Sequence, residues 1–385
     1  MKIGVNAIGF ISGKVGGTET YVKNLWKYLQ LVDNNNEYMI LCSSKYSDEF
    51  RRTNDQFKLG KCNYLKPSIN WLIRGIIRNT INTDILKSVI DKYNFDVIHF
   101  PFTVLSPIGL ASPSVLTFWD MQHEFYPEFF SNRELRTRQA LYKPSVENAT
   151  RVIVSAEFTK RCLVERYGIK PEKIDVIHTG YGHEYRIIED QEALDKIRTR
   201  YGLFKPFMYY PAATWPHKNH KTLLAAFRLL IDRYPFDGHL VFSGIAMQWQ
   251  REIMEEITKL GLDGSVKILG YLPNEELPYL YNLARIMVFP SLFEGFGIPL
   301  VEAMACGCPV VCSDATSIPE VVGKAGIIFD PLSKEDIAEK IWSAWNADSR
   351  IEQMKRTGIE RVKLFNWEFA ARKTIEVYKK AVAQT

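Results

Sequence analysis

The sequence contains few cysteines and no dense cluster of basic residues. Its six cysteines are scattered over 385 residues, which excludes a disulfide framework. Cys306, Cys308 and Cys312 lie close together, but no fourth ligand completes a zinc pattern near them. We expect these three to be small buried residues in a reducing cytosol. The formal net charge of +5 suits anionic small molecules or an acidic membrane surface. A dedicated nucleic-acid binder would cluster its lysines and arginines, so nucleic acid is not an expected partner.

The sequence also lacks a signal peptide, since MKIGVNAIGF at its start is typical of a short buried strand. One stretch without formal charge, residues 97–119, is long enough to cross a bilayer. Its prolines Pro101, Pro107 and Pro113 would break a helix repeatedly, so we expect two strands joined by a loop. These features predict a cytoplasmic protein without a membrane span.

The length of the chain and its hydrophobic pattern predict two domains. A chain of 385 residues is long for one hydrophobic core. Short β-rich runs alternate with amphipathic helical segments, a pattern of parallel sheets covered by helices on both faces. The pattern restarts after a polar segment. We therefore predict an α/β protein with two Rossmann-like domains, whose parallel sheets face each other across a cleft where ligands bind. The predicted parts are a domain over residues 1–182, a linker over 183–205, a domain over 206–365 and a closing segment over 366–385.

Two glutamates, Glu294 and Glu302, stand eight positions apart in the stretch FEGFGIPLVEAMACGCPVVCSD, residues 293–314. A strand-like run precedes the turn EGFG, and a helix is predicted to start near Pro299. Glycines let a backbone approach a ligand closely, and the N–H groups at a helix start bind anions such as phosphate. We expect Glu302 to hold a ribose and Glu294 a hexose, with a pyrophosphate between them. The alternative is a helix start that carries acidic residues only because its dipole favours them.

This stretch resembles the E-x7-E signature of the retaining nucleotide-sugar glycosyltransferases of family 4, which have the GT-B fold. The similarity extends over most of the chain. GGTETYVKNL resembles the first-loop G-G-x-E of the family and the helix behind it. RVIVSAEFTKRCL and IDVIHTGY resemble the late strands of the N-terminal domain, and NWEFAARKTIEVYKKAV resembles the closing helices. The resemblance implies that the N-terminal domain binds the acceptor, that the C-terminal domain binds the nucleotide sugar, and that the last helix returns to the N-terminal domain.

The resemblance also implies a set of donor-binding residues. Lys218 stands where the family has a lysine for the donor phosphate, and a cation there would offset charge on the departing nucleoside diphosphate. The alternative is a solvated lysine at a helix start. The usual arginine five residues earlier is Ala213 here, and His217 is its candidate replacement. The first-loop glycines could form only a tight turn. The expected donor-binding residues are Gly16, Gly17, Glu19, His217, Lys218, Gly295, Phe296, Gly297, Ile298 and Glu302.

The stretch TFWDMQHEFYPEFF follows an N-terminal strand into the expected cleft. Family members commonly have a histidine immediately before the aspartate, whereas Trp119 precedes Asp120 here and His123 is the candidate replacement. A structural role is the alternative for a lone histidine. The nearby Phe125 and Tyr126 suit either a sugar face or the core. The candidate catalytic residues are Glu294, Lys218, His123 and Asp120.

The segment Ile69–Ile90 is a candidate membrane contact. It carries Trp71 among the arginines Arg74 and Arg78, and a basic amphipathic helix can lie on an anionic membrane. The alternative is a core-facing helix with its arginines in solvent. The first interpretation predicts peripheral association with the inner face of the cell membrane.

The expected activity is retaining hexosyl transfer. No D-x-D aspartate pair sits at a strand end, so we expect no metal and no cofactor. DMQHEFYPEFF and PHKNH are similar to bacterial mannosyltransferases of O-antigen and exopolysaccharide synthesis. They favour mannose, with GDP-mannose as the first donor, a UDP-hexose as the second, and a saccharide or lipid-linked acceptor. The alternatives are a GT-B epimerase or phosphorylase and a non-catalytic nucleotide-sugar-binding relative.

Overall fold

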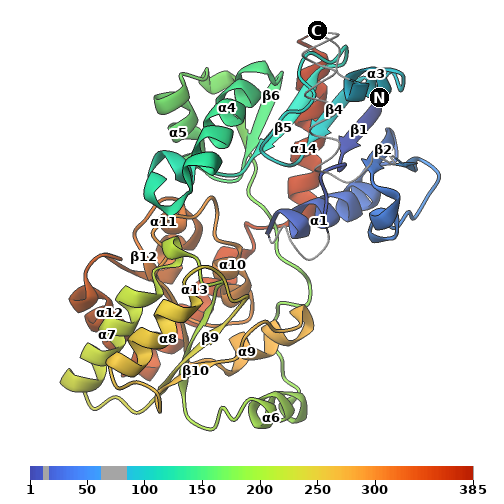
Figure 1. Cartoon of the computed structure of the whole chain (residues 1–385). Helices are drawn as coiled ribbons and strands as arrows, with labels where there is room; N and C mark the ends of the chain where they lie inside the picture. The colour runs from blue at the N-terminus through green and yellow to red at the C-terminus, as the bar shows by residue number, and fades with distance from the viewer. Residues whose placement is uncertain (12–16, 62–84, 385) are drawn as a thin grey trace. The chain divides into compact units, whose positions relative to one another are not determined.

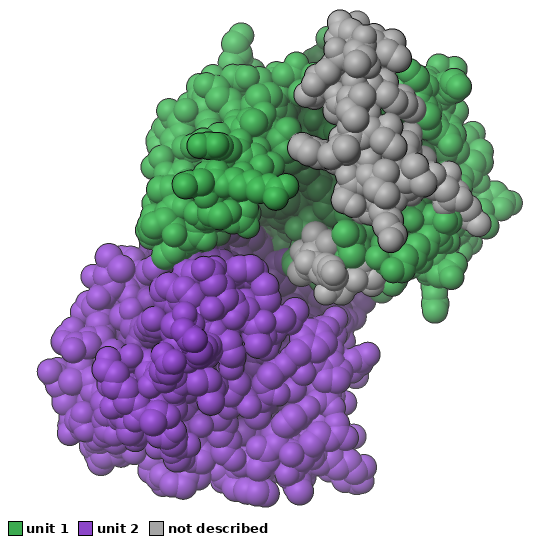
Figure 2. Space-filling model, viewed as in Figure 1, with its two compact units in different colours: residues 1–180, 366–385 green, residues 181–365 purple. Residues whose placement is uncertain are grey.

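The computed structural model describes residues 1–11, 17–61 and 85–384. They form two compact units, which Figure 2 shows in different colours. The first unit comprises Met1–Gly180 together with Asn366–Thr385, and the second comprises Tyr181–Phe365. The chain therefore passes from one unit to the other after Gly180 and again after Phe365.

The first unit contains a parallel sheet of seven strands in the order β3-β2-β1-β4-β5-β6-β7. The chain runs outward from the centre to β3 and then returns beside β1, so the strand order reverses between β1 and β4. Ligands of such sheets bind at the carboxyl ends of the strands near this reversal. The strands are β1 (Lys2–Asn6), β2 (Glu37–Cys42), β3 (Phe57–Lys61), β4 (Val97–Phe100), β5 (Ser114–Phe118), β6 (Arg151–Val154) and β7 (Ile174–Val176).

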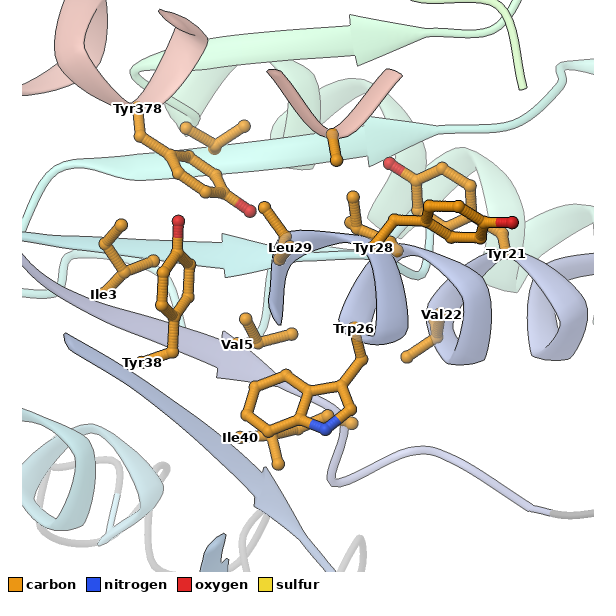
Figure 3. Close-up of a cluster of buried hydrophobic side chains, with 14 of the residues drawn as sticks. Ile3, Val5, Tyr21, Val22, Trp26, Tyr28, Leu29, Tyr38, Ile40 and Tyr378 are labelled. Carbon is orange, nitrogen blue, oxygen red and sulfur yellow. The ribbon is translucent and has the colours of Figure 1, made fainter. Parts of the chain in front are cut away.

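Both faces of this sheet are covered because neighbouring strand residues point to opposite sides. Val97 and Val115 belong to a cluster with side chains of α1 and α14, whereas Ile98 and Leu116 belong to a second cluster with side chains of α3, α4 and α5. Figure 3 shows part of the first cluster, including Tyr21 and Trp26 of α1 and Tyr378 of α14. The helices are α1 (Gly17–Val32), α3 (Ile85–Asp91), α4 (Asn132–Asn148), α5 (Glu157–Tyr167) and α14 (Trp367–Val382).

The closing helix α14 belongs to the first unit, as predicted. It packs against α1 and contacts β4, β5 and β6 (Figure 1). Its Tyr378 hydroxyl lies 2.8 Å from His99 Nδ1 in the buried core, and Lys380 Nζ lies 2.6 Å from Asp175 Oδ1. These polar contacts place the helix in one register on the sheet.

The segment 97–119 forms two strands with a loop between them, as predicted, because β4 pairs with β5 in parallel. In the part of the chain that the structure describes, none of the helices is both long and apolar enough to cross a bilayer. Cys306, Cys308 and Cys312 are free and buried, which confirms their interpretation as small buried residues.

The second unit contains a parallel sheet of six strands in the order β10-β9-β8-β11-β12-β13. The order reverses between β8 and β11, so the loops after these two strands meet at one edge of the sheet. The strands are β8 (Phe207–Pro211), β9 (His239–Ser243), β10 (Val266–Ile268), β11 (Ile286–Phe289), β12 (Val310–Ser313) and β13 (Gly326–Phe329). The helices are α6 (Gln191–Arg200), α7 (His220–Arg233), α8 (Gln250–Lys259), α9 (Leu277–Leu283), α10 (Ile298–Ala305), α11 (Ile318–Val322), α12 (Lys334–Trp345) and α13 (Asp348–Val362).

The polar segment 183–205, predicted as a linker, is a packed part of the second unit. Its helix α6 contacts α9 and buries Leu194 and Ile197, which stand three residues apart on one face. Before this helix, the Ile188 N–H donates to Asn282 Oδ1 over 2.9 Å. Two apolar residues on one face suffice to dock a short helix, and the polar remainder faces solvent.

Candidate functional site

The loops after β8 and β11 lie side by side in the second unit because these strands are neighbours. The loop after β8 contains a short 3-10 helix, Pro216–Lys218, and its carbonyls bind the neighbouring elements. The Leu292 N–H donates to the His217 carbonyl over 2.8 Å, and the Tyr210 hydroxyl donates to the Lys218 carbonyl over 2.8 Å. Backbone contacts therefore hold Lys218 at the edge of the sheet.

Lys218 and Glu294 form an ion pair, with Lys218 Nζ 2.6 Å from Glu294 Oε1. Their side chains are 17% and 13% exposed, so each charge is partly shielded and keeps one open side. The turn that carries Glu294 is itself held by the loop after β12. The Glu294 N–H donates to Thr316 Oγ1 over 3.0 Å, and the Ser317 hydroxyl donates to the Glu294 and Phe296 carbonyls over 3.0 and 3.1 Å.

Helix α10 begins directly after this turn. Gly297 occupies its N-cap position with a φ of 98°, and no side chain caps the first turn. Pro299 stands in the first turn, as predicted. The backbone N–H groups at the start of the helix therefore have no side-chain cap beside the Lys218–Glu294 pair. This is the arrangement that suits a phosphate.

Glu302 lies in α10 beyond its first turn, which contains no acidic residue. The alternative that its position reflects only the helix dipole therefore loses its support, because that effect falls off within the first turn. The Tyr281 hydroxyl donates to Glu302 Oε2 over 3.1 Å, and the Tyr185 hydroxyl is a second hydrogen-bond partner. Although part of Glu302 still meets solvent, burial of its carboxyl raises the pKa to about 7, against the opposing effect of the two tyrosines.

In the first unit, the described part of the predicted donor loop is the start of α1. Gly17 is the first residue of this helix, and the Glu19 carboxylate pairs with Lys23 Nζ at 2.8 Å within the helix. Gly16 lies outside the described residues, as do Trp71, Arg74 and Arg78 of the proposed membrane contact. The roles of these residues stay predictions.

Asp120 and His123 share the loop after β5, and their surroundings differ. Asp120 is half-buried, and its Oδ1 accepts a hydrogen bond from the Gln122 N–H over 3.0 Å. His123 is 2% exposed, and its Nε2 lies 3.4 Å from the Tyr167 hydroxyl. Its ring packs edge-on against Tyr142, and burial lowers its pKa. These contacts favour the structural role for His123.

The sequence interpretation did not identify three residues that shape this site. Tyr185 lies in the segment taken for a linker, and Tyr281 lies in α9, where an aromatic residue at helical spacing is indistinguishable from an ordinary core residue. Asn219 was read only as part of the PHKNH stretch. Its side chain donates to the carbonyls of Pro290 and Pro331 over 3.1 and 2.8 Å, which joins three loops. The backbone at Asn219 has a φ of 59°, a conformation that asparagine tolerates well, so the residue type itself was the one local signal in the sequence.

Comparisons with known proteins agree with this arrangement. The model of glycosyl transferases group 1 matches residues 195–361, and the model of glycosyltransferase family 4 matches residues 15–185. The Escherichia coli O-antigen chain mannosyltransferase B is 32% identical over 267 residues, which cover 69% of this chain and 70% of that protein. The serotype-specific mannosyltransferase WbdA of Escherichia coli is 30% identical over 240 residues, which cover 60% of this chain but only 29% of that longer protein.

Solved structures share the fold at low sequence identity. Sucrose-phosphate synthase of Thermosynechococcus elongatus is 20% identical with a TM-score of 0.78, and the match covers both chains completely. Anabaena HepE in complex with UDP-glucose is 18% identical with a TM-score of 0.74, and the match covers 99% of this chain and 100% of that chain. The two parallel sheets, the two family models and the similarity to mannosyltransferase B agree. This chain therefore belongs to the family 4, group 1 glycosyltransferases, which are enzymes with two Rossmann-like domains.

Proposed function

We propose that this glycosyltransferase transfers mannose from GDP-mannose to a saccharide or lipid-linked acceptor of a cell-surface polysaccharide, with a UDP-hexose as the second candidate donor. The Escherichia coli relatives are mannosyltransferases by name, and one of them acts on the O-antigen chain. The observation that carries the proposal is the Lys218–Glu294 pair, at 2.6 Å, beside the start of α10.

Each residue of this site has a proposed role in binding the donor. Glu302 accepts hydrogen bonds from the ribose hydroxyls, and Glu294 accepts them from the hexose. The diphosphate lies at the start of α10, where Gly297 allows a close approach of the backbone. Without donor, Lys218 and Glu294 neutralise each other. When the donor binds, Lys218 pairs with the diphosphate instead, and Glu294 accepts hydrogen bonds from the hexose hydroxyls.

The proposed reaction retains the anomeric configuration and requires no metal. The acceptor hydroxyl attacks the anomeric carbon, and the bond from this carbon to the diphosphate oxygen breaks. A donor phosphate oxygen on the same face of the sugar takes the proton of the acceptor hydroxyl. Lys218 stabilises the negative charge that grows on the leaving diphosphate, and a preorganised cation at such a position is an effective source of catalysis.

The first unit is proposed to bind the acceptor. A lipid-linked acceptor would bring the enzyme to the inner face of the cell membrane, and the segment Ile69–Ile90 is the candidate contact. Asp120 and His123 remain candidates at the side of the donor sugar. The burial of His123 makes Asp120 the better candidate, because Asp120 keeps part of its surface open.

A donor screen followed by product analysis tests the proposal. A ligand that binds only the folded chain raises the melting temperature, so GDP-mannose should give the largest shift in a panel of GDP- and UDP-sugars. The best donor is then incubated with EDTA, and slow release of the free sugar with retained configuration is expected by NMR. Loss of activity in EDTA that magnesium restores would contradict the metal-free reaction. An epimerised sugar, a dependence on inorganic phosphate, or binding without turnover would favour the epimerase, the phosphorylase or the non-catalytic relative, respectively.

A further inference from the structure

The carboxyl of Glu302 lies between two tyrosines from separate parts of the second unit. Tyr281 comes from α9 and donates to Oε2 over 3.1 Å, and Tyr185 comes from the segment before α6 and hydrogen-bonds the same carboxyl. The rings of Tyr185 and Tyr281 also pack against each other, with centroids 6.0 Å apart. Both tyrosines are buried, so neither hydroxyl is an ordinary surface group. We call these two residues the tyrosine pair.

The position of Tyr185 is determined by the chain around it. It follows Gly180, the last residue of the first unit before the crossing, by five positions. The carbonyl of the next residue, Arg186, accepts a hydrogen bond from Asn282 Nδ2 over 2.9 Å, and the Ile188 N–H donates to Asn282 Oδ1 over 2.9 Å. The crossing segment, the residues that follow Gly180 up to Ile188, is therefore bound to α9 on both sides of Asn282's side-chain amide, and Tyr185 reaches Glu302 from a backbone held there.

The electrostatic surroundings of Glu302 contain no compensating cation among the described residues that act on its carboxyl. The one charged group there is another carboxylate, Glu184, which disfavours the ionised form. The tyrosine hydroxyls favour it, because they donate hydrogen bonds to the carboxylate. Among the described residues, the titratable groups that interact with Glu302 are Tyr185 and Glu184 of the crossing segment, Tyr209 of β8, Tyr281 of α9, and Cys306, which follows the last residue of α10.

We propose that Tyr185 and Tyr281 are positioning residues of the donor site, which orient the Glu302 carboxylate so that its remaining lone pairs receive the ribose hydroxyls. A carboxylate has about four acceptor positions, and the tyrosine pair occupies two of them. The two that remain can accept a pair of neighbouring hydroxyls, as a ribose offers. This role rests on the proposed function, since it requires that Glu302 binds a nucleotide.

The same geometry makes donor binding dependent on pH. Burial raises the pKa of Glu302 to about 7, so the group is partly protonated in the empty site at neutral pH. Ribose hydroxyls that donate to it favour the ionised form, so binding releases a proton below this pH. Donor affinity should therefore rise as the pH increases through about 7. Removal of a tyrosine hydroxyl should move this rise to higher pH, because the carboxylate loses a donor.

Calorimetric titration of the full chain with GDP-mannose and with UDP-glucose, between pH 6 and pH 8.5, tests the proposal. These probes carry fully ionised diphosphates over this range, so the change in affinity reports on the protein. The single variants are Tyr185→Phe, Tyr281→Phe and Glu302→Gln. Two double variants combine each of the Phe substitutions with Glu302→Gln. Tyr279→Phe, which alters the same helix α9, is the matched control, and melting temperatures confirm that each variant is folded.

Each Phe variant should bind the donor about tenfold more weakly at pH 8 and show its affinity rise at higher pH than wild type. In the Glu302→Gln background the same substitutions should have little further effect, because the group they position is gone. Unchanged affinity and an unchanged pH profile in both Phe variants, with a normal wild type, would overturn the role of the tyrosine pair alone. A wild type that binds neither probe would overturn the proposed function and this role with it.

Discussion

At the scale of single residues, the Lys218–Glu294 pair contributes to the stability of the folded chain and is also proposed to bind the donor. The two charges neutralise each other at 2.6 Å in a partly shielded site, and both are proposed to change partners when the donor binds. Removal of one charge leaves the other partly buried without a counter-ion, which destabilises the folded chain as well as the complex. A variant of either residue is therefore informative only when its stability is measured beside its kinetics.

Lys218→Ala should reduce turnover more than donor affinity. Charge on the leaving diphosphate grows in the transition state, so the lysine contributes most there, and loss of such a group lowers kcat by about 100- to 1,000-fold. Steady-state kinetics with the best donor separate kcat from KM. Lys221→Ala is the matched control. Lys221 lies three residues further on in α7, and its Nζ lies over the Trp249 ring rather than beside Glu294. An unchanged kcat with a raised KM would assign Lys218 to binding alone.

Glu302 should make the stability of the empty enzyme depend on pH. Burial raises its pKa to about 7 in the folded chain, from 4.5 in the unfolded chain, so the folded state holds the extra proton between these values. Stability then falls as the pH rises from about 4.5 through 7, by up to about 3 kcal/mol. Urea titrations of wild type and Glu302→Gln at pH 5 and pH 8 measure the effect. The variant should lose this fall, and equal pH dependences in the two proteins would contradict the assignment.

At the scale of elements, the start of α10 depends on the turn before it. Gly297 has a φ of 98°, and a Cβ built at this position would come within 2.8 Å of Leu300 Cδ1. Thr316 and Ser317 bind the same turn through their hydroxyls, so it is held from the neighbouring loop. The N–H groups that are proposed to hold the diphosphate therefore depend on one glycine and two hydroxyl side chains.

Gly297→Ala should weaken both the fold and donor binding. A side chain at this φ of 98° costs about 1–2 kcal/mol, and a turn that relaxed this strain would no longer present the same N–H groups to the diphosphate. Thermal unfolding and the Kd for the donor measure the two effects. Gly264→Ala is the control, because a Cβ at Gly264 meets nothing within 4 Å. A normal melting temperature in Gly297→Ala would show that the turn tolerates a side chain.

The segment Ile69–Ile90 carries a prediction that depends on sequence alone for residues 69–84, since its end belongs to α3, where Leu86 and Ile90 are buried in the core. If it lies on the membrane, binding to vesicles should increase with their content of anionic lipid and decrease with salt, at about 1 kcal/mol for each basic residue near the surface. Arg74→Glu combined with Arg78→Glu should weaken this binding and leave donor hydrolysis unchanged. Sedimentation with vesicles provides the measurement. A wild type that ignores anionic vesicles at low salt would favour the alternative of a core-facing helix.

At the scale of the whole molecule, the first unit is built from both ends of the chain. Helix α14 follows the second unit in sequence, yet it packs against α1 and the central strands of the first sheet. The buried His99 ring connects it to the sheet, with Nδ1 2.8 Å from the Tyr378 hydroxyl and Nε2 2.7 Å from Thr117 Oγ1. Burial lowers the pKa of His99 to about 3, so this connection stays neutral at physiological pH.

Tyr378→Phe should destabilise the first unit and leave donor binding in the second unit intact. The substitution leaves His99 Nδ1 buried without its partner, which costs about 1–3 kcal/mol. Scanning calorimetry should show a lower melting temperature for the first unit, while the Kd for the donor stays at the wild-type value. Lys379→Ala, on the exposed side of the same helix, is the control. A wild-type melting profile in Tyr378→Phe would show that the hydrogen bond contributes little.

The sequence by itself determined the features that depend on short-range interactions. Short apolar runs that alternate along the chain with amphipathic helical segments were sufficient to predict two parallel sheets, because burial on both faces makes each strand apolar throughout. The turn before α10 and the start of the helix near Pro299 also followed from local rules for glycine and proline. The spacing of Glu294 and Glu302 belongs to the same turn and helix, and it was enough to indicate the family.

Only the tertiary structure decided which side chains meet. Lys218 and Glu294 are 76 positions apart, and they touch because β8 and β11 are neighbours in the sheet order. Tyr185 reaches Glu302 because the polar segment after the crossing docks on α9, although its composition suggested a linker. The buried His123 ring packs edge-on against Tyr142, a contact that the sequence around it did not indicate. Such contacts depend on the packing of elements that are distant in the chain, and no local pattern of residues encodes them.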